Sequence, residues 1–212
     1  MLENEKKGEN NSSIYNYKLI DRINIKYTNF YWKWVDIFSC RLCKIADRYN
    51  KNIAKEYIQE FKMFDIHNAK NILHIGCGSY PITAMTLYNL NGGNITGLDK
   101  SEKAVKRARK IINHRKYHDR IRIENGNGKN FSLDKFDTII VSGCAIPKIK
   151  ILKNLFEKAN SKTRIIVRES INLSNVVSQY IYDSKHLVEI KNHMSNKPNE
   201  KGGWESYLIV KK

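Results

Sequence analysis

Two closely spaced glycines and one aspartate are the residues whose types and spacing best fit the binding of a small ligand. Gly76 and Gly78 follow an apolar run at 72–75 and precede a segment with a helical pattern. Glycine lets the backbone approach a ligand closely. Asp99 lies about 20 residues further on, where a carboxylate can accept hydrogen bonds from the ribose of an adenosine-containing ligand. The sequence predicts a nucleoside site, although Asp99 could instead cap the helix that begins near Ser101.

The third glycine of the dinucleotide-binding pattern is absent, and Ser79, Tyr80 and Pro81 stand in its place. Pro81 suits the first turn of a helix, where its missing N–H donor costs nothing. Asn127, which could meet an adenine edge, and the segment 142–144 follow two later apolar runs and are expected at the same crevice. The candidate ligand-binding residues are Gly76, Cys77, Gly78, Ser79, Tyr80, Pro81, Thr83, Asp99, Lys100, Gly126, Asn127, Ser142, Gly143 and Cys144.

Strand and helix patterns alternate around these residues. Strands are predicted at 72–75, 94–98, 121–124, 136–141 and 164–168, and helices at 84–88, 103–113 and 148–159. Such alternation implies parallel strands joined by right-handed crossovers, with helices on both faces. Two further strands, at 186–190 and 206–210, have no helical pattern between them and should form an antiparallel hairpin at the sheet edge. This predicts an α/β, Rossmann-like class I methyltransferase fold with seven strands, whose ligand is S-adenosylmethionine.

The chain divides into three parts by pattern. Residues 1–13 are polar and are expected to be disordered or extended. Apolar residues recur every three or four positions over 14–68, which predicts a small helical cap. Residues 69–212 form the predicted S-adenosylmethionine-binding catalytic domain. His74, inside the first strand, is expected to be a hydrogen-bonded core residue.

The composition of the 212 residues is that of a globular protein, with 41% hydrophobic and 28% charged residues. No apolar run reaches the roughly 18 residues of a membrane span, and 1–7 lacks the apolar core of a signal peptide. We therefore expect a cytoplasmic location and no membrane partner. Cys40 and Cys43 form one Cys-x-x-Cys pair, but no second pair completes a zinc site, so no metal is expected.

The formal net charge is +17, and it has two interpretations. Clustered Lys and Arg give affinity for nucleic acid by releasing counterions. Lysine, asparagine and isoleucine are all abundant, however, and the positive charges run from Lys6 to Lys212, which favours a chain-wide compositional preference. Nucleic acid is the less favoured partner.

The glycine loop and three later segments resemble the nicotianamine synthase family, particularly its archaeal members. The loop at 75–83 matches that family's glycine-x-glycine-x-x-proline-x-threonine pattern, and Pro81 and Thr83 are its distinctive residues. Later segments that look like the family in order and spacing are 141–148, 163–168 and 204–211. The resemblance covers about 44–212.

This resemblance implies an unusual use of S-adenosylmethionine. An amine attacks the carbon gamma to the carboxylate, the 3-amino-3-carboxypropyl group is transferred, and methylthioadenosine leaves. In the family a tyrosine and a carboxylate from the helical cap assist, and Tyr49 with Glu56 or Glu60 would match them. Tyr49 could instead pack the cap on the sheet, and the glutamates could be solvated. Arg168 and Glu169, just past the fifth strand, are candidates for binding the acceptor, an amine or amino acid.

Three alternatives remain open on the sequence alone. The same sheet serves ordinary methyltransferases that act on small molecules, although no Asn-Pro-Pro-Tyr type motif follows the fourth strand. Aromatic and basic residues interleave at 31–34, as in RNA-binding surfaces, but at helical spacing such aromatics are more often core. A catalytically inactive binding protein is the third alternative. The exposed aromatic face of the cap leaves homodimer formation open.

Overall fold

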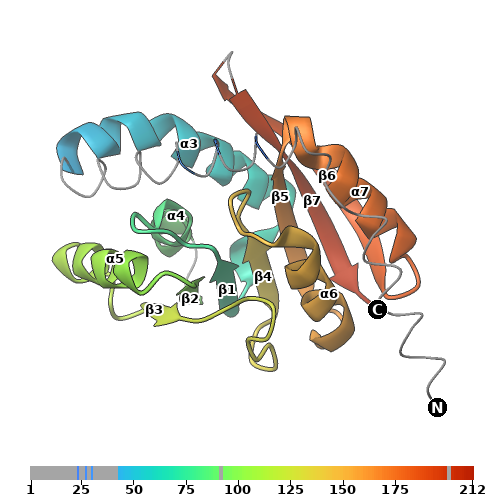
Figure 1. Cartoon of the computed structure of the whole chain (residues 1–212). Helices are drawn as coiled ribbons and strands as arrows, with labels where there is room; N and C mark the ends of the chain where they lie inside the picture. The colour runs from blue at the N-terminus through green and yellow to red at the C-terminus, as the bar shows by residue number, and fades with distance from the viewer. Residues whose placement is uncertain (1–22, 24–26, 28–29, 31–42, 91–92, 200–201) are drawn as a thin grey trace.

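The computed structural model describes residues 23, 27 and 30 and the ranges 43–90, 93–199 and 202–212. Within these residues, seven strands form one sheet in the order β3-β2-β1-β4-β5-β7-β6 (Figure 1). Strands β1 to β5 are parallel, and β7 runs antiparallel to both β5 and β6. The predicted α/β, Rossmann-like class I methyltransferase sheet with its terminal hairpin is confirmed.

The strands are β1 (Asn71–Ile75), β2 (Asn94–Asp99), β3 (Ile121–Asn125), β4 (Thr138–Val141), β5 (Arg164–Ser170), β6 (Val188–Asn199) and β7 (Gly202–Lys211). The helices are α3 (Cys43–Met63), α4 (Ile82–Leu90), α5 (Glu102–His114), α6 (Lys148–Lys158) and α7 (Ser174–Asp183). Two short 3-10 helices are η2 (Ile66–Asn68) and η3 (Ile171–Leu173). The sequence analysis did not identify α7, whose buried Val177 and Ile181 lie four residues apart.

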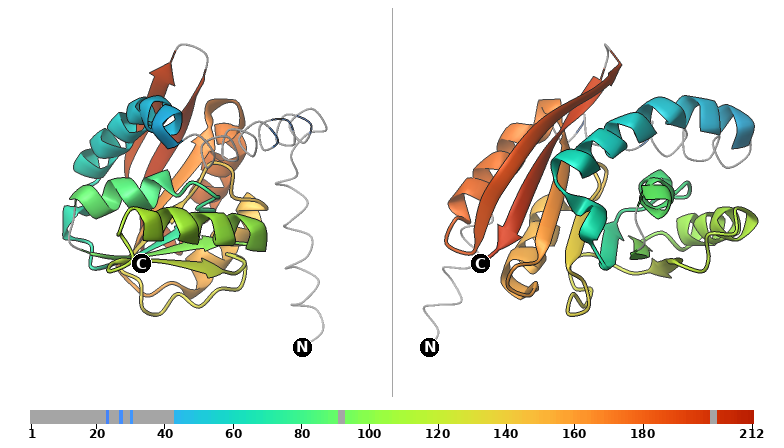
Figure 2. Two further views of the ribbon diagram at one scale, coloured as in Figure 1. Left: turned by 90° about the vertical axis from the view of Figure 1, so that its left-hand side faces the viewer. Right: turned by 180° about the vertical axis from the view of Figure 1, so that it is seen from behind.

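Side-chain alternation along the strands builds two apolar layers. On one face, Ile72, Ile140, Ile166 and Leu208 share a core with α4 and α5. On the other face, the neighbouring residues of the same strands pack with α6 and α7. Helices α3, α4 and α5 therefore cover one side of the sheet and α6 and α7 the other, as both views in Figure 2 show.

The first described helix, α3, is joined to the sheet core rather than separate from it. Phe61 near its end, and Phe64 and Ile66 just beyond, are at most 4% exposed and belong to the core that contains β1 and β2. Most of the predicted cap before residue 43 lies outside the described residues. Within them, α3 lies against α4 on the same side of the sheet (Figure 1) and also contacts β6.

Membrane and metal features can be stated for the described ranges. None of the helices in them is long and apolar enough to cross a membrane. The same residues contain no group of three or more His, Cys, Asp or Glu side chains that could hold a metal ion. Cys40 lies outside these ranges, so the Cys-x-x-Cys pair stays a sequence-level observation.

Candidate active site

The loop after β1 turns on its two glycines. Gly76 has φ +81° and Gly78 has φ +69°, a backbone region in which side chains are strained. A Cβ added at Gly76 would lie 3.0 Å from the Cβ of Ala145, so the loop also needs the missing side chain for close packing. The N–H groups of Gly76 and Cys77 both donate to the carbonyl of Leu98, at 2.8 and 3.1 Å. These bonds hold the loop against the end of β2.

Asp99 ties that loop to the next helix. Its Oδ2 accepts from the N–H of Gly78 at 3.0 Å, and its Oδ1 accepts from the N–H of Ser101 at 2.9 Å. Ser101 caps α5 by accepting from the N–H of Ala104 at 3.3 Å. The two roles predicted for Asp99, in a helix cap and in a ligand site, are therefore compatible, because the carboxylate orders the start of α5 and also lines the crevice. A carboxylate fixed by two backbone donors is prepared to receive ribose hydroxyls.

A crevice with about 360 Å³ of space open to solvent lies at the carboxyl ends of β1, β2 and β4. Its lining residues are Ile75, Gly76, Leu98, Asp99, Lys100, Gly126, Asn127, Gly128, Cys144, Ala145, Ile146 and Ile151. Six predicted ligand-binding residues are thus brought together by four different loops. Apolar side chains beneath and polar groups at the rim suit the flat base and ribose of a nucleoside.

Several predicted ligand-binding residues lie elsewhere. The side chain of Cys77 is buried in the core, and a Cβ added at Gly97 would lie 3.2 Å from its Sγ. Tyr80 turns toward the end of α5, where its hydroxyl accepts from Arg115 at 2.9 Å. Thr83 faces the sheet beneath α4, while Ser79 and Pro81 are buried. Their backbone shapes the loop, but the start of α4 turns these side chains away from the crevice.

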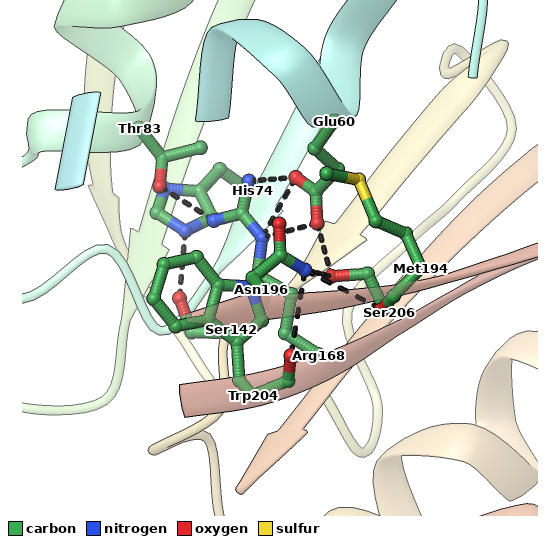
Figure 3. Close-up of polar contacts among 9 residues, drawn as sticks. All are labelled: Glu60, His74, Thr83, Ser142, Arg168, Met194, Asn196, Trp204 and Ser206. Atoms are coloured by element: carbon green, nitrogen blue, oxygen red, sulfur yellow. Dashed lines mark hydrogen bonds and ion pairs between the residues drawn. The ribbon is translucent and has the colours of Figure 1, made fainter. Parts of the chain in front are cut away.

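A buried ion pair lies where α3 crosses β5 and β7 (Figure 3). Arg168 donates from Nε and Nη2 to the carboxylate of Glu60, with an Nη2–Oε2 distance of 2.5 Å, and neither side chain is more than 3% exposed. The hydroxyl of Ser206 donates to Glu60, and Arg168 Nη1 donates to Thr83 Oγ1 at 2.8 Å. Burial alone would lower the pKa of Arg168, but the neighbouring Glu60 carboxylate holds that pKa above its usual value.

This pairing changes the expected role of Arg168. The sequence analysis placed Arg168 as a holder of an acceptor carboxylate and Glu60 as a separate assisting carboxylate. In the structure the two bind each other, so an acceptor carboxylate has no access to the guanidinium in this arrangement. Glu60, rather than Glu56, makes the contact, and Glu56 is half-buried one turn earlier on α3. The backbone of Tyr49 lies in α3, but its side chain is outside the described set.

Tyr57 is the site residue that the sequence analysis missed. It precedes Glu60 by three residues and therefore lies on the same face of α3. Its ring stands 3.8 Å from the guanidinium carbon of Arg168 and packs edge-on against Trp204 at 5.5 Å between centroids. Desolvation raises the pKa of the Tyr57 hydroxyl. The half-buried phenol therefore keeps its proton at neutral pH and can orient a ligand by hydrogen bonding.

Lys148 holds the loop after β4 in place by hydrogen bonds to its carbonyl groups. This fully buried amino group donates to the carbonyls of Ser142, Gly143 at 3.2 Å and Arg168 at 2.8 Å, and it lies 3.8 Å from the carboxylate of Glu169. Its three donors have three acceptors. Glu169, which was expected to bind the acceptor, is only 3% exposed and is the counter-ion of Lys148.

His74 is a core residue, as expected. It is 2% exposed, and its Nε2 lies 2.7 Å from Ser142 Oγ. Desolvation, with a smaller effect from Arg168, lowers the pKa of His74 to about 3. The imidazole is therefore neutral at physiological pH, and it holds the start of the 142–144 loop.

Three buried polar atoms in this region have no hydrogen-bond partner among the described residues: His74 Nδ1, Asn196 Oδ1 and Trp204 Nε1. Asn196 on β6 and Trp204 on β7 are cross-strand neighbours near the turn end of the hairpin. A register shift between Ile190 and Asn192 brings the later part of β6 onto the α3 face. The polar group of Figure 3 thus extends from α3 and β1 to the terminal hairpin.

This sheet, with its glycine loop after β1 and an aspartate at the end of β2, is typical of S-adenosylmethionine-dependent transferases. A family model described as a methyltransferase domain matches residues 66–209, more than half of the chain. The chain belongs to this methyltransferase domain family. It is a transferase enzyme whose cofactor is S-adenosylmethionine, and Gly76, Asp99 and Asn127 line the crevice at the ends of its strands.

Solved structures show the same fold at low identity. A mutant of MtNAS, a nicotianamine synthase, superposes with a TM-score of 0.73 at 15% identity, covering 92% of this chain and 78% of that one. MtNAS in complex with MTA and tNA gives 0.62 at 20% identity, covering 74% of this chain and only 61% of that one. The mitomycin 7-O-methyltransferase MmcR gives 0.60 at 15% identity, covering 75% and 54%. None of the curated proteins matches the sequence.

Proposed function

We propose that this enzyme transfers the 3-amino-3-carboxypropyl group of S-adenosylmethionine to the nitrogen of an amine or amino acid and releases methylthioadenosine. The observation that carries the proposal is the cluster of Tyr57, Glu60 and Arg168. A tyrosine and a carboxylate of α3 both contact Arg168 there, and a tyrosine and a carboxylate from this helical segment are what the resemblance to nicotianamine synthases implies. We assign to Tyr57 the role that the sequence analysis gave to Tyr49.

The comparisons add support of a second kind. One MtNAS structure superposes over 92% of this chain and another over 74%, and MmcR superposes over 75%. The extra coverage reaches beyond the methyltransferase domain at 66–209 and includes residues before it. We take this longer superposition as support for a synthase-like acceptor site over that of an ordinary methyltransferase.

In this proposal, the residues of the cluster position the acceptor and enclose the site. Bound S-adenosylmethionine would supply an electrophilic carbon. The neutral acceptor nitrogen would bond to it as the carbon–sulfur bond breaks, the electron pair would leave with the sulfur of methylthioadenosine, and the product nitrogen would keep its proton as an ammonium until solvent removes it. Tyr57, protonated at neutral pH, accepts a hydrogen bond from the acceptor nitrogen and aims its lone pair. The ion pair of Glu60 with Arg168 holds the Tyr57 ring in place, while Trp204 closes the site from the hairpin.

The nucleoside by-product tests this proposal. Purified enzyme is incubated with S-adenosylmethionine and a mixture of the common amino acids and polyamines, and the nucleosides are identified by chromatography and mass. We expect methylthioadenosine well above a protein-free blank. We also expect Tyr57→Phe to lower the rate at least tenfold without changing the Kd for S-adenosylmethionine, because the ring stays while the orienting oxygen is lost. Release of S-adenosylhomocysteine instead would make the enzyme a small-molecule methyltransferase, the alternative that MmcR illustrates.

A further inference from the structure

Positive charge is dense in the segment around α5, and a second basic segment, 148–164, carries a net charge of +5. Residues 102–122, which hold α5 and the start of β3, contain nine of the 38 Lys and Arg and two of the 21 Asp and Glu. Their net charge is +7, so the other 191 residues share +10. The charge per residue is about six times higher in this segment, and a chain-wide preference for lysine does not explain that difference.

The fold turns part of this charge into a continuous surface. Apolar Ala104, Val105, Ala108 and Ile111 bury one face of α5 in the core. Lys103, Lys106 and Lys110 therefore follow one another on the opposite face at spacings of three and four, and all three are exposed. Neighbours at such spacings lie about 5–6 Å apart. Lys116, also exposed, follows just past the end of α5, and we call these four lysines the α5 stripe.

Other basic residues near the stripe are held in fixed positions. Arg109 donates to the carbonyl of Ile123 at 2.8 Å, and Arg115 donates to the hydroxyl of Tyr80. Arg120 lies 4.1 Å over the ring of Tyr88. These arginines add positive potential while remaining bound to the fold. Among the stripe lysines, Lys106 pairs with Glu102 at 2.8 Å, an exposed contact of the kind that stabilises little and that a phosphate can replace.

The surface carries charge without apolar area. No exposed large hydrophobic side chain lies within 102–122. Protein partners usually require an apolar centre in the interface, and insertion into a membrane requires exposed apolar side chains. A phosphodiester backbone requires neither, because lysines bind it by releasing its counterions. The chemistry of the stripe therefore fits nucleic acid better than an acidic protein or an anionic lipid surface.

The position of α5 gives this surface a relation to the active site. The helix begins directly after Asp99 and Lys100, which line the crevice, and runs to the outer edge of the layer formed with α3 and α4 (Figures 1 and 2). A nucleic-acid strand bound along the α5 stripe would therefore end near the rim of the crevice. We propose that the α5 stripe is a binding surface for nucleic acid, recognised through its phosphodiester backbone without regard to sequence.

Two matched triple variants test this proposal. The first replaces Lys103, Lys106 and Lys110 of α5 with Gln, and the second replaces Lys150, Lys153 and Lys158, exposed lysines of α6 on the opposite side of the sheet, with Gln. Both lower the net charge by three, so long-range attraction changes equally. Binding of a fluorescent 20-nucleotide poly(U) RNA and of the same length of poly(dT) is measured by anisotropy from 50 to 300 mM salt.

We expect the wild-type enzyme to bind both nucleic acids with an affinity that falls as salt rises, with a slope that corresponds to the release of several counterions. The α5 variant should bind at least tenfold more weakly at 100 mM salt and lose about 2–3 from the slope of log K against log salt, since each phosphate contact contributes about 0.7 on a single strand. The α6 variant should stay within twofold of the wild type. Equal binding of RNA and DNA would show that the stripe contacts the phosphates alone. A preference for RNA would show that the protein also contacts the 2′-hydroxyl groups.

Three results would overturn the proposal: no salt-dependent binding by the wild type, equal losses in both variants, or a loss confined to binding of anionic vesicles measured in parallel. Folding of the variants is checked by their melting temperature and by their Kd for S-adenosylmethionine, which should both be unchanged. The proposal is independent of which group the enzyme transfers, so the nucleoside by-product does not decide it.

Discussion

Replacing Glu60 with Gln lowers the free energy of unfolding by about 3–5 kcal/mol, the usual cost of leaving one member of a buried ion pair without its partner. Arg168 is 2% exposed, so water cannot replace the lost carboxylate. Ser206, which donates to Glu60, would face an amide in its place. Urea unfolding monitored by circular dichroism measures the loss.

A double variant separates charge from packing. Glu60→Met with Arg168→Met removes both charges and keeps a filled core, so it should recover most of the stability lost in Glu60→Gln. Glu56→Gln, on the half-buried position one turn away, is the matched control and should change stability by less than about 0.5 kcal/mol. Full stability of Glu60→Gln would show that the ion pair does not hold α3 on the sheet.

Lowering the pH from 7 to 4.5 should cost the wild-type protein roughly 3 kcal/mol of stability through His74 alone. Its pKa is lowered from 6.5 to about 3 by burial. Below pH 6.5 His74 becomes protonated in the unfolded chain but stays neutral in the folded protein. The contribution of His74 to the free energy of unfolding is therefore fully present above pH 6.5 and decreases as the pH falls to about 3. Each pH unit in this window corresponds to about 1.4 kcal/mol.

Substitution of His74 isolates this contribution from other titrating groups. His74→Gln keeps a polar side chain that does not titrate here, so its stability should fall by about 3 kcal/mol less between the two pH values. The matched control is His118→Gln, an exposed histidine, whose pH dependence should equal that of the wild type. Denaturant titrations at pH 7 and 4.5 supply the comparison. Identical pH dependence in His74→Gln and wild type would contradict the burial argument.

The strands and the cofactor loop could be predicted from sequence because local chemistry decides them. Apolar runs mark β1 to β5, and Gly76 and Gly78 are required where φ is positive. Asp99 could be placed because its strand end and its spacing from the loop are both visible in the sequence. The crevice lined by Asp99, Lys100 and Asn127 follows from the rule that parallel strands present their carboxyl ends at one edge.

The contacts between distant segments could not be predicted in the same way. The pairing of Glu60 with Arg168 joins residues 108 apart in the chain, and nothing in the spacing of either indicates the other. The burial of Lys148 has no local signal either, because it depends on two carbonyls of the loop after β4 and one carbonyl of strand β5. Tyr57 shares its helix face with Glu60, and that spacing was the available signal for it.

A doubly labelled cofactor tests the central claim most directly. S-adenosylmethionine carrying ³H in the methyl group and ¹⁴C in the aminobutanoate chain is incubated with the enzyme and the same acceptor mixture. Asp99→Asn serves as the variant impaired in cofactor binding. Aminocarboxypropyl transfer predicts ¹⁴C in the amine product and ³H retained in the nucleoside, with both signals reduced by Asp99→Asn. Recovery of ³H in the product and of ¹⁴C in the nucleoside would contradict the account and show that the enzyme transfers the methyl group.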